Sequence, residues 1–520
     1  MAENLHTLYV IGPPGAGKTT FIRRQVETWR DRGEYAPADI VLTSFTRAAA
    51  AVLAGQIPVP PDHIATLHAL CYRGLGHPPL AEGGALRKQW DAECAAAGLG
   101  IYQIAATPDL EDEGVYRERV SGDAPGAMLA AYSLWRSTGR VNLYLEEYTR
   151  AFAVRWEAFK ADTGSIDFTD MLELGLHNLE VCPGAPAVLA VDEAQDLSPL
   201  QWQIIDRWGA RCERVMVAGD PAQSLYGWLG ASPERLLASP GISTTGDQRR
   251  VLSQSYRLSP EIQQYAESWL SLHSPPMMEG RTYRARSDGS GQVTRSAATW
   301  EHPDELMRLL DSELSEGRRV MILASCSYML RPTIKLLRET GIRYHNPYRR
   351  KAGAWNPGSP QAHTAALSYL VGPMGDTWWS WGEHLPAKFF GGTKKAAAAM
   401  SAAWALTEEA YQRAAASDVP WLRGAMLKNP ALDYELSCAQ GERFFEEPLV
   451  VIGTVHSVKG AEADTVVMFP DLSEAGAAES RGSVQGHDAL VRMIYVGLTR
   501  SRGDVVLCDP AQRRNAVWWP

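Results

Sequence analysis

Residues 8–19 read LYVIGPPGAGKT. The apolar run Leu8–Ile11 is typical of a buried parallel strand, and the loop after it fits G-x-x-x-x-G-K-[ST], a pattern that opens a helix. In that setting the backbone N–H groups of the loop surround phosphate oxygens, and the helix N-terminus adds a partial positive charge. The stretch therefore predicts an α/β sheet with a phosphate site at the carboxyl end of its first strand.

The residue types in this loop suit a nucleoside triphosphate with Mg²⁺. We expect Lys18 to reach the β- and γ-phosphates, and Thr19 to offer its hydroxyl to Mg²⁺. An accidental glycine-rich turn is the alternative, and the order of strand, loop, Lys-Thr and helix argues against it. The residues expected to bind the nucleotide here are Gly12, Pro13, Gly15, Ala16, Gly17, Lys18, Thr19 and Thr20. The predicted cofactors are accordingly ATP and Mg²⁺.

Further apolar runs look like parallel strands, with helical stretches between many of them. They are Ile40–Thr43, Ala187–Val191, Val215–Ala218, Val320–Leu323, Leu449–Thr454, Thr465–Phe469 and Val505–Leu507. Strands that alternate with helices predict doubly wound α/β units. Because such runs occur in both halves of the chain, we expect two α/β cores.

Two mostly helical stretches interrupt this rhythm, and we interpret each as an insertion in one core. The first core is expected from residues 1–71 and 161–250, with its insertion at 72–160. The second core is expected from 251–345 and 448–520, with a short tryptophan-rich insertion at 346–447. The helices expected in the first insertion are Gly84–Ala97, Pro125–Thr138 and Leu143–Asp162.

Composition excludes several classes of protein. Of the 520 residues, 45% are hydrophobic and 21% charged, which is ordinary for a globular chain. The longest strongly apolar stretch, Ala396 to Leu406, is too short to span a bilayer, and no signal peptide is predicted. The seven cysteines form no C-x-x-C pair, which argues against a zinc ribbon or a disulfide framework. We expect a cytoplasmic protein whose net charge of −9 still permits a local positive groove.

An acidic stretch, DEAQD at 192–196, directly follows the run Ala187–Val191. A carboxylate at the carboxyl end of a strand can hold Mg²⁺, and we expect Asp192 to do so. The adjacent Glu193 can take a proton from the attacking water. A solvated acidic loop is the alternative, which the pairing with the phosphate loop disfavours. After the next strand, Gln223 lies where it can sense the γ-phosphate or its water.

Taken in order, these motifs resemble the UvrD/PcrA/Rep type of superfamily 1 DNA helicases, and their RecB/AddA relatives, from Val10 to Asp509. The matching segments are GPPGAGKT (12–19), SFTRAA (44–49), ATLH (65–68), IDFTDML (166–172), DEAQD (192–196), GDPAQSLYGWLG (219–230), QSYR (254–257), TVHSVKGAE (454–462) and YVGLTR (495–500). The resemblance implies two RecA-like cores with ATP between them.

The same resemblance implies roles in the nucleotide site. Tyr256 would stack on adenine, Glu462 would belong to the cofactor site, and Arg257 and Arg500 would point at the γ-phosphate from the second core. The implied catalytic residues are Lys18, Asp192, Glu193, Gln223, Arg257 and Arg500. For the arginines taken singly, a surface salt bridge is the alternative. Because an arginine finger stabilises charge on the transferred phosphoryl group, hydrolysis would depend on closure of the cleft.

The resemblance also implies that single-stranded DNA lies across the tops of both cores. The implied contact residues are Phe45, Thr46, Arg47, Thr66, His68, Tyr226, Trp228 and His456. Phe45 and Trp228 follow strand ends, where ligands bind in open α/β sheets, so base stacking is favoured over simple core packing. For the two histidines a phosphate or motif-linking contact is favoured over a metal role, because no ligand cluster accompanies them.

The expected function is an ATP-dependent translocase on single-stranded DNA and a helicase moving 3′ to 5′. Its expected partners are single-stranded DNA, tailed duplex DNA and an accessory replication or repair protein, and it is expected to be a monomer. The alternative is a nucleotide-gated DNA-binding or assembly factor that does not unwind duplex alone. Three departures favour the alternative: the short second insertion, Leu229 where relatives have arginine, and only seven residues before the first strand, where relatives carry an adenine-reading glutamine segment. The missing segment leaves selectivity for ATP over GTP open.

Overall fold

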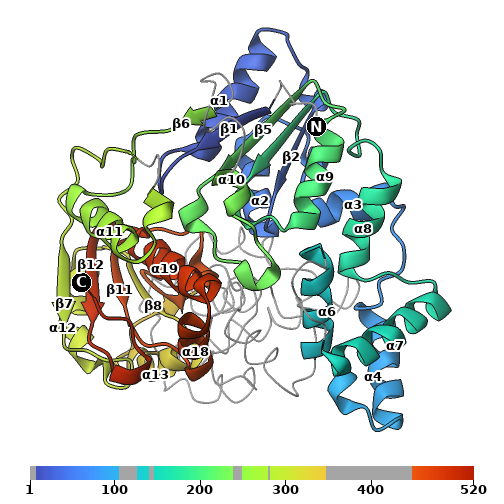
Figure 1. Ribbon diagram of the computed structural model, residues 1–520. Coiled ribbons are helices and arrows are strands. Elements are labelled where there is room, and N and C mark those ends of the chain that lie inside the picture. The colour runs from blue at the N-terminus through green and yellow to red at the C-terminus, as the bar shows by residue number, and fades with distance from the viewer. Residues whose placement is uncertain are drawn as a thin grey trace, which may run out of the picture.

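The computed structural model describes residues 7–104, 126–139, 146–237, 249–278, 282–346 and 448–519. These residues form two parallel sheets of six strands each, with helices on both faces (Figure 1). The predicted α/β class with two RecA-like parallel-sheet cores is confirmed.

The first sheet has the strand order β3-β2-β4-β5-β1-β6, and the second has β7-β12-β11-β8-β10-β9. The strands of the first sheet are β1 (Thr7–Ile11), β2 (Ile40–Ser44), β3 (Ile64–Ala65), β4 (Val188–Asp192), β5 (Arg214–Gly219) and β6 (Arg249–Val251). Those of the second are β7 (Val293–Ser296), β8 (Val320–Ala324), β9 (Tyr344–His345), β10 (Val450–Thr454), β11 (Ala463–Met468) and β12 (Ser501–Cys508). All eight strands expected from the apolar runs are present, and the four unexpected ones are the edge strands β3, β6, β7 and β9.

Successive side chains of the central strands point to opposite faces of the first sheet, and each face packs against its own layer of helices. On β4, Val188 and Ala190 pack with helices α1 (Lys18–Asp31) and α2 (Arg47–Gln56). The alternate residues Leu189 and Val191 pack with the helices on the opposite face. Those helices are α3 (Leu67–Gly74), α8 (Phe168–Asn178) and α9 (Pro199–Gly209). Every residue of β4 is buried, so its carboxyl end is held firmly between the two layers.

The second core is layered in the same way. Its helices are α11 (Pro260–His273), α12 (Leu306–Ser315), α13 (Arg331–Glu339), α18 (Glu474–Gly482) and α19 (Val484–Leu498). Helices α11 and α19 pack in one buried cluster of the sheet and helices α12 and α13 in another. As a result α19, which leads into strand β12, lies beside the first core at residues Pro221–Gln223.

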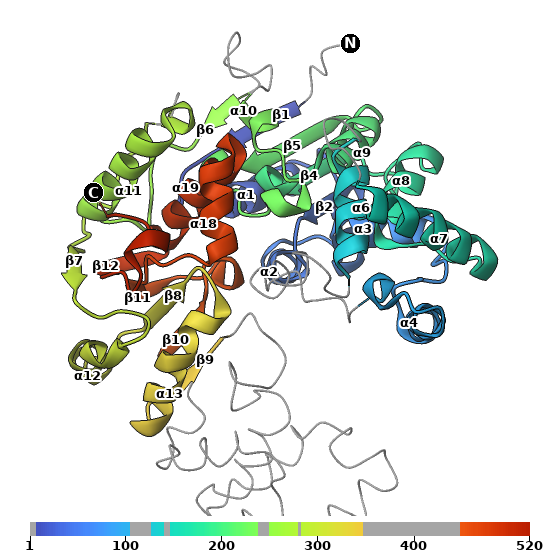
Figure 2. The same cartoon turned by 60° about the horizontal axis from the view of Figure 1, so that its bottom comes forward.

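The helical insertion of the first core lies on the side away from the second sheet (Figure 2). It contains α4 (Gly84–Ala96), α6 (Ala127–Ser137) and α7 (Glu147–Thr163), which correspond to the three expected helices. Trp90 and Trp156 lie at the centre of its own hydrophobic cluster. The expected second insertion, at 346–447, lies outside the described residues apart from Asn346. Within the described ranges, no helix combines the length and apolar character needed to cross a membrane.

Candidate functional site

The glycine-rich loop joins β1 to α1, as its sequence predicted. Gly15 and Gly17 adopt φ values of 69° and 78°, the left-handed region that favours glycine. A side chain on Gly15 would also collide with Arg257, so the loop can approach the second core only with glycine there. The Lys18 ammonium donates to the carbonyl oxygens of Gly12 at 3.0 Å and Pro13 at 3.4 Å.

Two acidic residues face this loop from the end of β4. The Thr19 hydroxyl donates to Asp192 Oδ2 at 2.8 Å. Glu193, the next residue, has φ 55°, a left-handed conformation that is uncommon for a non-glycine residue. Gln195 donates a hydrogen bond to the Glu193 carboxylate. The strained turn thus directs the Glu193 carboxylate to a fixed position beside the phosphate loop.

Burial and neighbouring charges displace the pKa values of these groups. Burial, together with the charge of Glu193, raises the pKa of Asp192 to about 6. Burial also acts to raise the pKa of Glu193, but Lys459 and Lys18 outweigh it, so that pKa is lowered. Burial lowers the pKa of Lys18 although Asp220 and both carboxylates act against it. Displaced pKa values of opposite direction in one place are typical of functional sites.

The segment Gln254–Arg257 binds backbone carbonyl oxygens of the phosphate loop. The Ser255 hydroxyl donates to Pro14 O at 2.8 Å, and Tyr256 N donates to Gly15 O at 2.9 Å. Arg257 donates to Glu462 Oε1 at 2.8 Å and to Thr499 O at 3.1 Å. The Tyr256 side chain is 71% exposed, so its ring is open to a ligand. Arg257 is thereby placed between the loop of the first core and two motifs of the second.

Arg500 reaches the first core from the end of α19. Its guanidinium donates to Gln223 Oε1 at 2.9 Å, and Gln223 in turn donates to Asp220 Oδ2 at 2.7 Å. The side chain is fully buried, and burial, reinforced by Arg257, lowers its pKa to about 9. Lys459 crosses between the cores as well and forms an ion pair with Asp196. We call this region, where the loop and motifs of the first core meet Arg257, Lys459 and Arg500, the seam.

The aromatic residues expected to contact DNA form a connected row next to the seam. The rings of Phe45 and Tyr226 lie 4.8 Å apart, and those of Tyr226 and Trp228 lie 6.2 Å apart. Tyr226 is 2% exposed because Phe45 packs against it and the Lys459 ammonium lies 5.1 Å from its ring centre. Trp228 is partly buried, in the turn Gly227–Leu229. The ring of Tyr226 therefore links Phe45, Trp228 and Lys459.

The polar residues expected to contact DNA lie at helix starts and strand ends. Thr46 and Thr66 cap α2 and α3, accepting from Ala49 N at 3.1 Å and Ala69 N at 3.3 Å. Arg47 is the first residue of α2.

Of the two expected histidines, His456 is buried and His68 is partly buried. Burial, reinforced by Arg47, lowers the pKa of His68 to about 4, so its ring is neutral at pH 7. His456 follows β10 and is 5% exposed. In the part of the chain that the structure describes, neither histidine belongs to a group with metal-ligand spacing.

Lys459, Asp196 and Ser255 lie within the motifs named above, but their roles were not predicted from the sequence. The motifs contain these residues, but their bonding partners lie hundreds of positions away along the chain, so the sequence does not pair them. A second set of charged residues, around Arg136 and Asp167, was missed as a set, because its members come from separate helices. Both omissions concern contacts between segments.

Two parallel sheets that meet at a glycine-rich phosphate loop, paired carboxylates and buried arginines define a two-core P-loop nucleotide-binding protein.

A family model described as an AAA domain matches residues 1–228. The chain is 24% identical to the ATP-dependent DNA helicase UvrD2 of Mycobacterium tuberculosis, over 96% of this chain and 76% of the relative. It is 22% identical to the ATP-dependent DNA helicase PcrA of Leuconostoc citreum, over 66% of this chain and 48% of the relative. To the ATP-dependent DNA helicase Rep of Salmonella typhimurium it is 32% identical, over 22% of this chain and 17% of the relative. These matches support the similarity to the UvrD/PcrA/Rep type of superfamily 1 DNA helicases that the motifs indicated.

Proposed function

We propose that the protein is an ATP-dependent translocase on single-stranded DNA and a DNA helicase that moves 3′ to 5′. The observation that carries this proposal is the seam, where Arg500 of one core bonds Gln223 of the other. ATP hydrolysis at this seam would change the contacts between the two cores, so that the chemical step and the movement of the cores are coupled.

In this proposal the phosphate loop and Lys18 bind the phosphates of ATP, and the exposed ring of Tyr256 stacks on its base. The hydroxyl of Thr19 and the carboxylate of Asp192, already 2.8 Å apart, are the oxygen ligands that Mg²⁺ prefers. The ion would neutralise charge on the β- and γ-phosphates. The residues thus fit both the nucleotide and the metal ion.

Glu193 is the proposed general base. Because its pKa is lowered, it is ionised at neutral pH and can accept a proton from water. Arg257 and Arg500 stabilise charge on the γ-phosphate, a contribution worth about 10³–10⁵ in rate for an arginine finger. Arg257 would exchange its contacts with Glu462 and Thr499 for the phosphate. This exchange makes the arrangement of the second core dependent on the nucleotide.

The contacts of the seam continue to the proposed DNA site. Gln223, bound to Arg500, lies three residues before Tyr226 in the same loop. Tyr226 packs on Phe45 and lies against Lys459, which is paired with Asp196. A change at the γ-phosphate would therefore shift the stacking residues, which hold bases independently of sequence.

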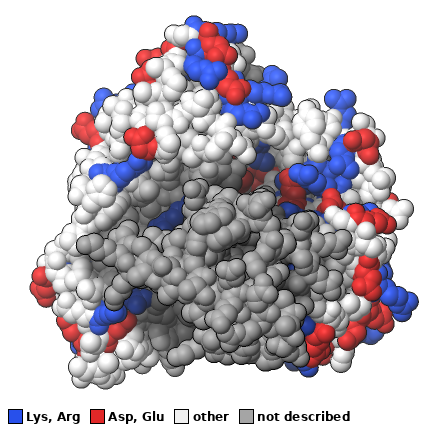
Figure 3. All heavy atoms as spheres, turned by 180° about the vertical axis from the view of Figure 1, so that it is seen from behind, with Lys and Arg blue, Asp and Glu red and all other residues white. Residues whose placement is uncertain are grey.

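The proposed DNA strand is held mainly by local contacts. On the described part of the face in Figure 3, Lys and Arg side chains are mixed with Asp and Glu. No broad basic surface is needed if Phe45 and Trp228 stack on bases while Arg47 and the starts of α2 and α3 contact phosphates. We further propose that the protein acts as a cytoplasmic monomer on tailed duplexes, with an accessory replication or repair protein.

The test is an ATPase assay with and without single-stranded oligonucleotides, followed by strand displacement on 3′-tailed and 5′-tailed duplexes. We expect strong stimulation by single-stranded DNA and displacement from the 3′ tail only. Lys18→Ala and Glu193→Gln should abolish turnover, while the control Lys335→Ala, at a lysine 75% exposed on α13, should not. Turnover that DNA does not stimulate would contradict the proposal.

A second function fits one observation. Leu229 is partly buried against the hydrophobic cluster of the second core, an apolar contact where relatives carry arginine. If this weakens coupling, the protein is a nucleotide-gated DNA-binding or assembly factor. Stimulated turnover without displacement from either tailed duplex would favour this function over the first.

A further inference from the structure

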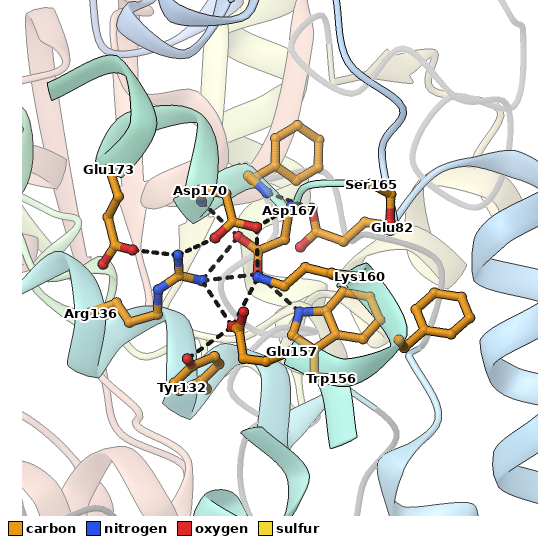
Figure 4. Close-up of polar contacts among 12 residues, drawn as sticks. Glu82, Tyr132, Arg136, Trp156, Glu157, Lys160, Ser165, Asp167, Asp170 and Glu173 are labelled. Atoms are coloured by element: carbon orange, nitrogen blue, oxygen red, sulfur yellow. Dashed lines mark hydrogen bonds and ion pairs between the residues drawn. The ribbon is translucent and has the colours of Figure 1, made fainter. Parts of the chain in front are cut away.

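A buried network of charges fixes the helical insertion to the first core (Figure 4). Arg136 of α6 donates to both oxygens of Asp167, at 3.1 and 2.9 Å, and to Glu173 at 2.6 Å. Lys160 of α7 donates to Asp167 at 2.9 Å and to Asp170 at 2.6 Å. The three carboxylates belong to the first two turns of α8 and its cap. We call this network the α6–α8 joint.

The joint also organises the start of α8. Asp167 caps the helix by accepting from Asp170 N at 2.7 Å, and Trp156 donates to the same carboxylate at 2.9 Å. The guanidinium of Arg136 is 2% exposed, so its contacts are made without competition from water. Its planar fork spans three carboxylates, a geometry that lysine cannot reproduce. Arg136 therefore sets the position of α6 relative to α8.

The opposite side of α6 supports the turn that holds Trp228. Gly230 ends this turn with φ 84°. A Cβ placed on Gly230 would lie 2.9 Å from Thr138 Cγ2 and 3.3 Å from Leu134 Cδ1. Leu134 and Thr138 stand two residues on either side of Arg136. The last turn of α6 thus touches the joint on one side and the Trp228 turn on the other.

We propose that Arg136 is a positioning residue for the strand-stacking turn Gly227–Leu229. By fixing the end of α6 on α8, it fixes the surface against which Gly230 packs, and with it the direction of Trp228. This inference rests on the proposed function, because it assumes that Trp228 stacks on a DNA base. It assigns the insertion a role in the grip on DNA without any contact between Arg136 and the strand.

A metal site is the other use of such carboxylates, and the contacts argue against it. Glu157, Asp167 and Asp170 have ligand atoms within 4.8 Å of one another. Lys160 forms ion pairs with all three, at 2.6 to 2.9 Å, so a cation already lies among them. A second cation would have to displace it.

The first experiment compares Arg136→Lys with Tyr132→Phe, a matched control on the same helix. The Tyr132 hydroxyl bonds the half-exposed Glu157 at 2.9 Å, so loss of that hydroxyl leaves the buried bonds of Arg136 and Lys160 to Asp167 intact. We expect Arg136→Lys to raise the DNA concentration for half-maximal ATPase stimulation about tenfold, the size of losing most of one stacked base. Turnover at saturating DNA and without DNA should stay within about twofold of wild type, because the seam is unchanged.

A salt series separates positioning from lost phosphate contacts. The slope of log affinity against log salt should be unchanged in Arg136→Lys, because the number of phosphates contacted is the same. A general loss of folded protein would instead lower turnover at saturating DNA and leave half-saturation where it was. That pattern, or a stimulation curve equal to that of wild type, overturns the inference.

A second pair of variants tests the contact itself, without touching the buried charges. Gly230→Ala should weaken stimulation by DNA, because alanine is strained at φ 84° and because the new Cβ meets Thr138 Cγ2. Adding Thr138→Ser removes that methyl group and keeps a hydroxyl for its 2.8 Å bond to Leu134 O. The double variant should recover the part of the loss that comes from the Thr138 contact, while the part that comes from the backbone strain remains. No recovery would show that α6 does not position the turn.

The two proposals fail in different ways. If DNA does not stimulate the wild-type ATPase, the proposed function falls and this inference falls with it. If the wild type is stimulated but Arg136→Lys and the Gly230→Ala pair behave as wild type, only the role of α6 is wrong.

Discussion

The seam and the α6–α8 joint are both buried clusters of charged residues, and they differ in how those charges are compensated. In the joint, burial acts against the charges of Asp167 and Arg136, but their contacts prevail, so the pKa of Asp167 is lowered and that of Arg136 is raised. In the seam, burial prevails at Asp192 and Arg500: the pKa of Asp192 is raised to about 6 and that of Arg500 is lowered to about 9. At Glu193 the two lysines prevail and the pKa is lowered. The joint thus stabilises the charges of Asp167 and Arg136, whereas the seam stabilises only some of its charged forms.

This difference in pKa shifts follows from which parts of the molecule supply the charged residues of each cluster. The joint lies within the first core and its insertion, so its partners stay together while the cores move. Apart from Lys18, the seam draws the cations named here from the second core, and it draws its carboxylates largely from the first. A buried charge that its neighbours compensate incompletely is stabilised most when a ligand of opposite charge binds beside it. We infer that the joint serves rigidity and that the seam serves the proposed nucleotide binding.

The largest expected effect comes from removing a seam arginine. Arg500→Ala should lower DNA-stimulated kcat by about 10³ or more, because an arginine finger stabilises charge that develops on the γ-phosphate. Arg513→Ala, at an exposed arginine near the end of the chain, is the control. The measurement is steady-state ATPase at saturating single-stranded DNA. A loss of less than about tenfold would place Arg500 outside the reaction, since removal of a finger costs far more.

For the free energy of unfolding we expect the opposite order, with a larger loss from removing Arg136 of the joint than from removing Arg500 of the seam. Arg136→Met should lower the free energy of unfolding by about 3–5 kcal/mol, because it leaves the buried carboxylates with only one of their two cations, Lys160. Arg500→Met should change it by about 1 kcal/mol or less, the usual net worth of a hydrogen bond, because burial already disfavours its charge. Urea unfolding of both variants measures the difference. Equal losses would remove the distinction between the two clusters.

The sequence predicted the sheets because their central strands are apolar on both faces. All eight expected runs are interior strands: β2, β4, β5 and β1 in the first sheet, and β12, β11, β8 and β10 in the second. The four missed strands are edge strands, and β3 and β9 have only two residues each. An edge strand pairs on one side only and needs no continuous apolar run, so its sequence carries little signal. Arg249–Val251 is an example, with two charged residues of three.

The site was predictable as far as local motifs determine it. Lys18, Thr19 and Asp192 meet as expected, because the carboxyl ends of the parallel strands of one sheet share one edge. The pairing of Lys459 with Asp196 depends on how two cores dock, and no local pattern specifies it. Arg136 and Asp167 are 31 positions apart on different helices, so their bond is a tertiary contact as well. Burial of Tyr226 behind Phe45 is a third case.

A smaller effect is expected where the seam meets the DNA site. Trp228→Ala should weaken binding of single-stranded DNA by about 1–3 kcal/mol, the worth of one base stacked on an aromatic ring. Trp518→Ala, at a tryptophan 59% exposed near the end of the chain, is the control. Fluorescence anisotropy of a labelled oligonucleotide measures both. Unchanged affinity in Trp228→Ala would mean that this ring serves only packing between the cores.

The smallest expected effect is a pH dependence confined to the seam. Burial raises the pKa of Asp196 to about 6, although Lys459 acts to lower it. Because this lies above the ordinary value of 3.8, the folded state binds a proton that the unfolded state lacks, so stability rises as the pH falls through about 6. In Asp196→Asn, which keeps an oxygen for Leu225 N, the gain between pH 7 and pH 5 should be roughly 1 kcal/mol smaller than in wild type. Urea unfolding at both pH values measures it, with Asp206→Asn, at an exposed aspartate on α9, as the control. If Asp196→Asn gained as much as wild type, the seam would be as well compensated as the joint, and the electrostatic contrast between them would be wrong.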